Sequence, residues 1–174
     1  MDVASLLNEK IFLGQEFLTW LWWRSEQEAP LQSAQGRMVE VLLGDHLVLG
    51  PAQGREGARV TVRGREASLA EAREGLKRGK LVETLRLGLI VDNEEFWLTL
   101  RAADFTISSL KLPPVRDGGE RGLDAQGLWL ERVALIEMAC SGLDDLLAAF
   151  LAERLDDEGQ GLKKRLQAWM HEEE

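Results

Sequence analysis

The strongest constraint on the fold is a two-residue repeat in the middle of the chain. From residue 85 to residue 91 every second position is apolar: Leu85, Leu87, Leu89 and Val91. This period places the apolar side chains on one face of a β-strand. Asp92-Asn93 then supplies a turn into a second strand over residues 96–101. The pattern predicts a β-hairpin.

A helix is predicted for residues 10–26, where the apolar period changes to that of an α-helix. The principal stripe consists of Leu13, Phe17, Trp20 and Leu21, and Leu18 and Trp22 form an adjacent stripe. Trp23 falls near the polar side, so the apolar arc is wider than one buried face requires. We therefore expect another element or chain to cover it, with Trp22 and Trp23 as interface residues.

Shorter elements are predicted on both sides of the hairpin. Gly79 is expected to end a helix over residues 69–78, and Pro113-Pro114 to end regular structure after a third strand at 105–110. Breaker-rich stretches, including Gly44-Asp45 and residues 50–57, separate three short segments that predict a small antiparallel meander. These segments are residues 38–43, 46–49 and 59–62.

Helices are predicted for the C-terminal part of the chain. Residues 128–140 and 143–155 have helical periods, with Ser141 and Asp144 at the start of the second helix. Residues 162–169 predict a short amphipathic helix. The expected fold is α+β: antiparallel sheets or hairpins packed with an aromatic-rich N-terminal helix and C-terminal helices. One domain is expected over residues 1–174, with its core in about 10–155 and a helix and acidic tail in 156–174.

Composition fits a folded protein of the cytoplasm. The 174 residues are 45% hydrophobic and 29% charged, which is enough to build a core without disulfides. Cys140 is the only cysteine, so an internal disulfide cannot form. The first ten residues lack the order of a signal peptide, and no apolar run has the length of a membrane span.

Patterns typical of catalytic and metal sites are absent from the sequence. His46 and His171 lie in different elements without metal-site spacing, and Gly75–Lys80 lacks the full phosphate-loop pattern. A magnesium nuclease is a weaker alternative, because the hairpin-tip acids Asp92, Glu94 and Glu95 lack a Glu-x-Lys partner. We expect a protein that is not an enzyme and needs no cofactor.

Charge is distributed unevenly around a net value of −9. Residues 51–86, the basic segment, contain nine Lys and Arg against five Asp and Glu, whereas both flanking regions are acidic. Cations gathered on one surface can bind phosphates without reading base sequence. The expected phosphate contacts are Arg63, Arg65, Lys77, Arg78 and Lys80. Alternatively, these charges are solvated or pair with acidic segments.

Three parts of the chain resemble the C-terminal part of the recombination-associated RdgC family. They are the string Gly14–Trp22 (GQEFLTWLW), the passage Glu71–Leu85 through Gly79-Lys80-Leu81-Val82, and the Leu-rich stretch Ile136–Leu155. The likeness spans roughly residues 10–155, and the N-terminal half usual in that family has no counterpart here. The resemblance implies a nucleoid-associated protein that forms a ring-shaped dimer around double-stranded DNA and restrains the RecA recombinase.

Two functions follow as expectations. The first is a non-enzymatic, sequence-nonspecific double-stranded DNA-binding protein of recombination or the nucleoid. Its partners would be DNA, a second copy or a companion chain supplying the absent half, and RecA, with no membrane. The second is a protein-interaction subunit that docks a partner chain without contacting nucleic acid, and the salt dependence of DNA binding separates the two.

Overall fold

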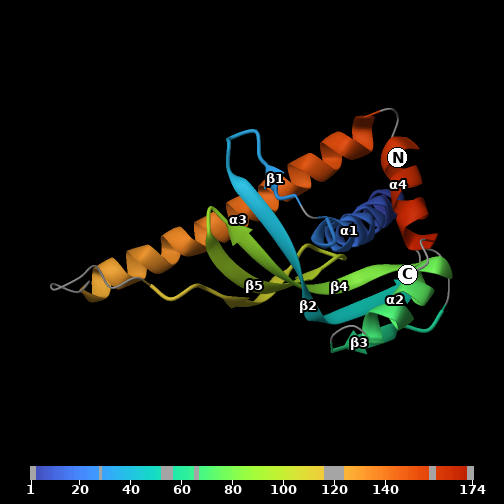
Figure 1. Cartoon of the computed structure of the whole chain (residues 1–174), viewed down its shortest axis with the longest axis horizontal. Helices are drawn as coiled ribbons and strands as arrows, with labels where there is room; N and C mark the ends of the chain where they lie inside the picture. The colour runs from blue at the N-terminus through green and yellow to red at the C-terminus, as the bar shows by residue number, and fades with distance from the viewer. Residues whose placement is uncertain are drawn as a thin grey trace.

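A six-stranded antiparallel sheet, covered by helices, forms the centre of the protein (Figure 1). The computed structural model describes residues 3–27, 29–51, 57–64, 67–115, 124–156 and 160–171. The predicted α+β class is confirmed. In chain order the elements are α1 (Val3–Ser25), β1 (Leu31–Gln32), β2 (Met38–Pro51), β3 (Val60–Arg63), α2 (Ala67–Lys77), β4 (Lys80–Val91), β5 (Glu94–Arg101), β6 (Ile107–Lys111), α3 (Ala125–Leu155) and α4 (Gln160–His171).

The predicted hairpin is the centre of the sheet. Strands β4 and β5 pair antiparallel, and the sheet order is β1-β2-β4-β5-β6, with β3 also paired to β2. Asp92 and Asn93 have φ angles of 48° and 73°. Positive φ at both central residues suits a two-residue hairpin turn, because its twist matches that of the strands. The third strand, β6, also follows the prediction.

The predicted meander needs a correction at Gly44-Asp45. Residues 38–43 and 46–49 belong to one strand, β2, which pairs with β4 along its length through an irregularity between Leu43 and Leu47. A Cβ on Gly44 would lie 2.6 Å from the carbonyl oxygen of Arg86. The glycine therefore permits close approach inside a bulged strand, rather than a turn. The pairing of residues 46–49 with β3 agrees with the prediction.

The alternating face of β4 forms the core. Leu85, Leu87, Leu89 and Val91 are fully buried, together with the α1 residues Phe17, Trp20 and Leu21. The Phe17 ring lies 6.1 Å from Trp20 and 5.4 Å from Phe150 of α3. Aromatic contacts at these distances add to the stability from area burial. They fix α1 and α3 on the same side of the sheet.

The two helices predicted for residues 128–155 are one continuous helix, α3, of 31 residues. Asp124 caps its start, accepting a 2.7 Å hydrogen bond from the backbone N–H of Gly127. A Cβ on Gly142 would lie 2.6 Å from Cγ2 of Val91. Gly142 therefore lets the helix approach β4 closely and does not end it. The predicted start at Ser141 is wrong for this reason.

Helices α2 and α4 agree with their predictions, whereas α1 begins at Val3, before the predicted start at residue 10. Helix α2 ends where Gly79 adopts a φ of +80°, and its N–H bonds to the carbonyl of Leu76 at 2.8 Å. Helix α4 packs beside α1 and α2 (Figure 1). The end of the predicted acidic tail, residues 172–174, lies outside the described residues. No helix in the described ranges has both the length and the apolar character to cross a membrane.

Candidate protein-interaction site

The predicted phosphate contacts fall at two places. Lys77 and Arg78 end α2, and Lys80 begins β4, so these three cations follow one another at a single turn. Arg63 lies on β3 and lines a separate shallow pocket with His46, Arg86 and Asp45. Arg65 lies outside the described residues. The structure thus brings Lys77, Arg78 and Lys80 together in one turn.

Many cations of the basic segment have partners within the chain. Arg59 pairs with Glu83 at 2.6 Å and Arg73 with Glu26 at 2.5 Å. Arg78 pairs with Glu74 at 3.0 Å and Arg86 with Asp45 at 3.3 Å. Lys80 donates to the carbonyl of Ala58. Each carboxylate offsets one positive charge, so the surface presents less positive potential than the count of arginines suggests.

Trp22 is a core residue, which corrects its prediction as an interface residue. Its side chain is fully buried, and the ring of Trp169 in α4 meets it edge-on at 5.4 Å. The indole Nε1 of Trp22 donates to Oε1 of Glu26 at 3.0 Å. A side chain without accessible surface in the single chain has nothing to offer a partner. Trp22 packs instead against α4, the C-terminal helix of the same chain.

Trp23 also has an intramolecular cover. Its side chain is half-buried, and the guanidinium of Arg165 lies 5.6 Å from the ring centroid. This distance is within the range of a cation–π contact. Arg165 itself pairs with Glu153 of α3 at 2.9 Å. Helix α4 therefore supplies the cover that the wide apolar arc of α1 predicted.

The string from Gly14 to Trp22 has a structural explanation throughout. A Cβ on Gly14 would lie 2.0 Å from the carbonyl oxygen of Ala102, so only glycine fits. Thr19 donates to the carbonyl of Gln15 at 2.7 Å and accepts from the N–H of Val82 at 3.4 Å. The aromatic residues of the string are buried. This string, one of the three segments that support the RdgC resemblance, thus specifies packing.

No protein-family model matches this chain, and no curated protein matches it significantly. The candidate site has to be found from the geometry alone.

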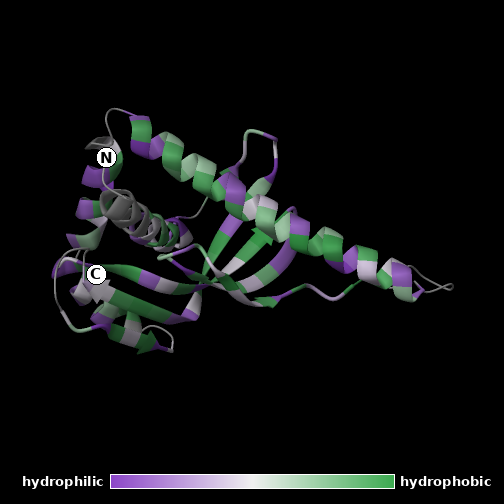
Figure 2. Ribbon diagram, turned by 180° about the vertical axis from the view of Figure 1, so that it is seen from behind, coloured by the Kyte–Doolittle hydropathy of each residue, from purple (hydrophilic) through white to green (hydrophobic). Residues whose placement is uncertain are grey.

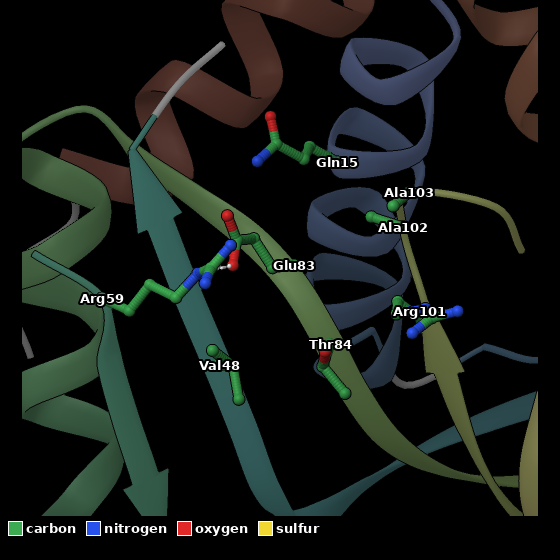
Figure 3. A pocket seen from close by; sticks show the side chains of 8 residues that line it. All are labelled: Gln15, Val48, Arg59, Glu83, Thr84, Arg101, Ala102 and Ala103. Atoms are coloured by element: carbon green, nitrogen blue, oxygen red, sulfur yellow. Dashed lines mark hydrogen bonds and ion pairs between the residues drawn. The ribbon is translucent and has the colours of Figure 1, made fainter. Parts of the chain in front are cut away.

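A pocket of about 470 Å³ lies where α1 meets the sheet (Figure 3). Gln15 lines it and is only 3% exposed, and its Oε1 has no hydrogen-bond partner among the described residues. The charged residues that line the pocket have ion-pair partners: Arg59 pairs with Glu83, and Arg101 pairs with Asp104. Hydrogen bonds from Arg101 and Thr106 hold the pKa of Asp104 well below its usual range, so Asp104 stays ionised as the partner of the Arg101 guanidinium.

The hairpin tip does not gather its acids into a metal site. Asp92 accepts from the backbone N–H of Met38 at 3.2 Å, and Glu95 accepts from Nε1 of Trp97 at 2.6 Å. These contacts tie the carboxylates to the sheet. Among the described residues, no group of three His, Cys, Asp or Glu side chains is placed to hold a metal ion.

The least expected surface is the first part of α3, residues 125–134, which we name the α3 arm. It extends beyond the edge of the sheet (Figure 1), and apolar residues interrupt its polar ones (Figure 2). Trp129 is 64% exposed and Leu130 54%. Leu128 is exposed too. Large exposed apolar side chains gathered on one helix are typical of protein-interaction sites.

The apolar residues of the arm belong to a regular row along α3. Trp129, Val133, Ile136 and Cys140 follow one another at intervals of four, three and four residues. We name these four residues the apolar seam. The same alternation continues through Leu143, Leu147 and Phe150, which pack against the core. Spacing of this kind is the signature of helix pairing. The spacing can be read from the sequence within the predicted helix 128–140, but only the structure shows that Trp129 and Ile136 are exposed.

Proposed function

We propose that this protein is a non-enzymatic assembly module that docks another protein chain through the α3 arm and the apolar seam. The proposal depends chiefly on the exposure of Trp129. Tryptophan is over-represented among the residues that dominate binding energy, and burying one on a partner removes a large apolar area from water. Leu130 and Ile136 extend the same surface.

The rest of α3 supports this role because it holds the arm in place. Leu146 and Phe150 are fully buried, and Arg154 pairs with Glu16 of α1 at 2.8 Å. The helix is therefore formed before any partner arrives. A preformed docking helix avoids most of the ordering cost that a flexible segment would incur on binding.

Binding of double-stranded DNA, and through it a restraint on RecA, stays a prediction. Lys77 is exposed at the end of α2. Within the described residues, its side chain forms no hydrogen bond or ion pair and is therefore open to a phosphate. The carboxylate pairs of Arg59, Arg73, Arg78 and Arg86 weigh against a strong positive surface. We therefore place protein docking first.

A site-specific photo-cross-linker tests the docking proposal. Benzoylphenylalanine replaces Trp129 in one version of the full chain and Leu155 in a control. Leu155 is 74% exposed at the opposite end of α3. We expect an adduct, identified by mass spectrometry, from position 129 and not from position 155. Binding between the purified partners should then weaken at least about tenfold for Trp129→Ala. Equal yields at both positions would contradict the proposal.

A parallel titration tests DNA. A labelled 30-base-pair duplex is titrated with the purified chain at several salt concentrations, and its fluorescence anisotropy is measured. Micromolar binding that weakens steeply with salt, and that Trp129→Ala leaves unchanged, would support DNA binding as the principal function. No binding at low salt leaves protein docking as the remaining proposal.

A further inference from the structure

We infer that the partner docked on the α3 arm is a positively charged amphipathic helix, which places a lysine or arginine in an acidic groove beside the arm. The inference rests on the proposed function, because it gives the chemistry of the partner for the same surface. Three properties support it: the groove at the base of the arm, the charge of the arm and the row of residues that joins the two.

An open groove of about 450 Å³ lies between α3, the turn that joins β1 to β2 and the tip of the β4–β5 hairpin. Its α3 side consists of Ala134, Glu137, Met138 and Ser141, and the rest of its lining consists of Gln35, Gly36, Arg37 and Asp92. The groove therefore begins in the arm and continues toward the sheet.

Two contacts hold the groove in shape. Nε of Arg37 lies 3.0 Å from Oδ2 of Asp145, a buried carboxylate of α3, so the β1–β2 turn is tied to the helix. The close approach of Gly142 to Val91 holds the end of β4 against the same helix. Both contacts are present in the unbound chain. A partner therefore finds the groove already formed, which lowers the ordering cost of binding.

The groove has an excess of negative charge. Arg37 is paired with Asp145, whereas Asp92 and Glu137 are exposed and form no ion pair in the part of the chain that the structure describes. A cationic side chain that entered the groove would face both carboxylates. Opposite charges placed in this way steer a partner and fix its register.

The arm itself is acidic. Between residues 124 and 144 the exposed charged residues are one cation, Arg132, and four acids, Asp124, Glu131, Glu137 and Asp144. None of these five forms an ion pair with another described residue. A negatively charged partner would meet unfavourable contacts along this surface, and so would another acidic arm of the same kind. The charge of the arm therefore favours a positive partner.

A row of residues on α3 leads from the exposed arm into the groove. Leu130, Ala134, Glu137 and Ser141 follow one another at intervals of four, three and four residues, so they share one side of the helix. Leu130 is exposed, and the other three line the groove. The seven residues from Leu130 to Glu137 span about 10 Å, or two turns. A partner helix along α3 would therefore carry its cation about two turns from the apolar side chains that cover Leu130 and Trp129.

The test is a selection of displayed peptides on the immobilised full chain. Each peptide is an amphipathic helix with a fixed leucine stripe, and its flanking positions are drawn at random from Lys, Glu and Gln. Peptides that also bind the Trp129→Ala chain are removed. We expect the remaining peptides to be enriched in Lys over Glu. Selection on a Glu137→Lys chain should shift the enrichment toward Glu, because the charge that the peptide meets is then reversed.

Affinity measurements then locate the cation. The best peptide is labelled with a fluorophore and titrated with the purified chain, and its anisotropy is measured. Glu137→Gln and Asp92→Asn should each raise the Kd about two- to fivefold, and added salt should weaken binding. Asn at position 92 keeps the acceptor for Met38 and tolerates the positive φ of the turn. Glu71→Gln is the control on α2, with an equal loss of charge, and should leave the Kd unchanged.

The outcomes separate this inference from the proposed function. Trp129-dependent peptides that are enriched in Glu or Gln, or that bind both neutralised variants as tightly as the parent chain, overturn the cationic helix and leave the docking proposal standing. Absence of any Trp129-dependent peptide also overturns this inference. If the cross-linker at position 129 then yields no adduct either, the docking proposal fails with it.

Discussion

The indole Nε1 of Trp169 donates a hydrogen bond to Oε2 of Glu26 at 2.7 Å, and this contact joins the C-terminal helix to the end of α1. The same carboxylate accepts from Nε1 of Trp22 at 3.0 Å and from Arg73 of α2 at 2.5 Å. Three helices therefore meet at one side chain. The two indole donors and the guanidinium would all lose an acceptor if that side chain were shortened.

Glu26→Ala should destabilise the fold by about 1–3 kcal/mol, because partly buried donors left without an acceptor incur a desolvation cost. The measurement is urea unfolding monitored by circular dichroism. Glu71→Ala is the matched control, since Glu71 is an exposed glutamate on α2. Equal midpoints for the two variants would show that the contact at Glu26 contributes nothing to stability.

Gly14→Ala should destabilise the protein by about 1–3 kcal/mol or prevent folding, because overpacking against main chain leaves little room for relaxation. The added Cβ would lie 2.0 Å from the carbonyl oxygen of Ala102. Gly161→Ala is the control on α4, where a Cβ meets nothing within 4 Å. That change should be neutral or stabilise the helix by up to about 1 kcal/mol. Thermal unfolding of both variants compares them directly, and an unaffected Gly14→Ala protein would contradict the close contact.

Lys77→Ala tests the predicted DNA binding at its best-placed residue. Arg78 already pairs with Glu74, and Lys80 donates to Ala58. We therefore expect Lys77→Ala alone to lower the slope of log affinity against log salt by about 0.9, one phosphate contact. The triple replacement of Lys77, Arg78 and Lys80 by Ala should add little to that change. Anisotropy titrations of the duplex measure both slopes, and a drop near three contacts for the triple variant alone would contradict this expectation.

Asp104 should titrate below the ordinary carboxyl pKa of 3.8, because hydrogen bonds from Arg101 and Thr106 favour its ionised form. The folded-state pKa is depressed, so the stabilising contribution is present above the unfolded-state value. It is lost as pH falls through the folded-state value. Carboxyl carbon NMR from pH 7 down to pH 2 follows the titration, in which the Asp104 signal should stay that of the carboxylate below the ordinary pKa, and Asp104→Asn identifies the signal. A midpoint at or above 3.8 would show that the pair with Arg101 does not form in solution.

The sheet could be predicted from the sequence where local signals agreed with each other. The alternation ending at Val91 and the Asp92-Asn93 turn both specify the hairpin, and neither depends on distant residues. Gly44 was misleading, because a glycine that ends a strand and a glycine that permits close packing look alike in a sequence, and the capping spacing of Ser141 and Asp144 also occurs inside a continuous helix. For Gly44 the difference lies in Arg86, which approaches it from the neighbouring strand β4.

The burial of Trp22 could not be predicted from the sequence, because the residue that covers it lies far away in the chain. Trp22 is separated from Trp169 by most of the protein, and no local pattern states that the two rings meet. The wide apolar arc of α1 correctly predicted that another element covers this helix. The sequence did not show whether that element belongs to the same chain. Trp129 shows the reverse case. Its row of apolar residues was readable, and only the structure shows that the first part of the row lies beyond the sheet.

Because α3 is continuous, it is one rod about 46 Å long. Its C-terminal half packs on the core, and its first part extends beyond the sheet (Figure 1). One unbroken helix therefore connects Trp129 to Phe150, which contacts Phe17 in α1. The helical phase between the packed half and the tip sets the direction in which an attached chain departs. One residue inserted near Val133 would turn Trp129 by about 100° around the helix axis. The core beneath would stay as it was, while the attached chain would point elsewhere.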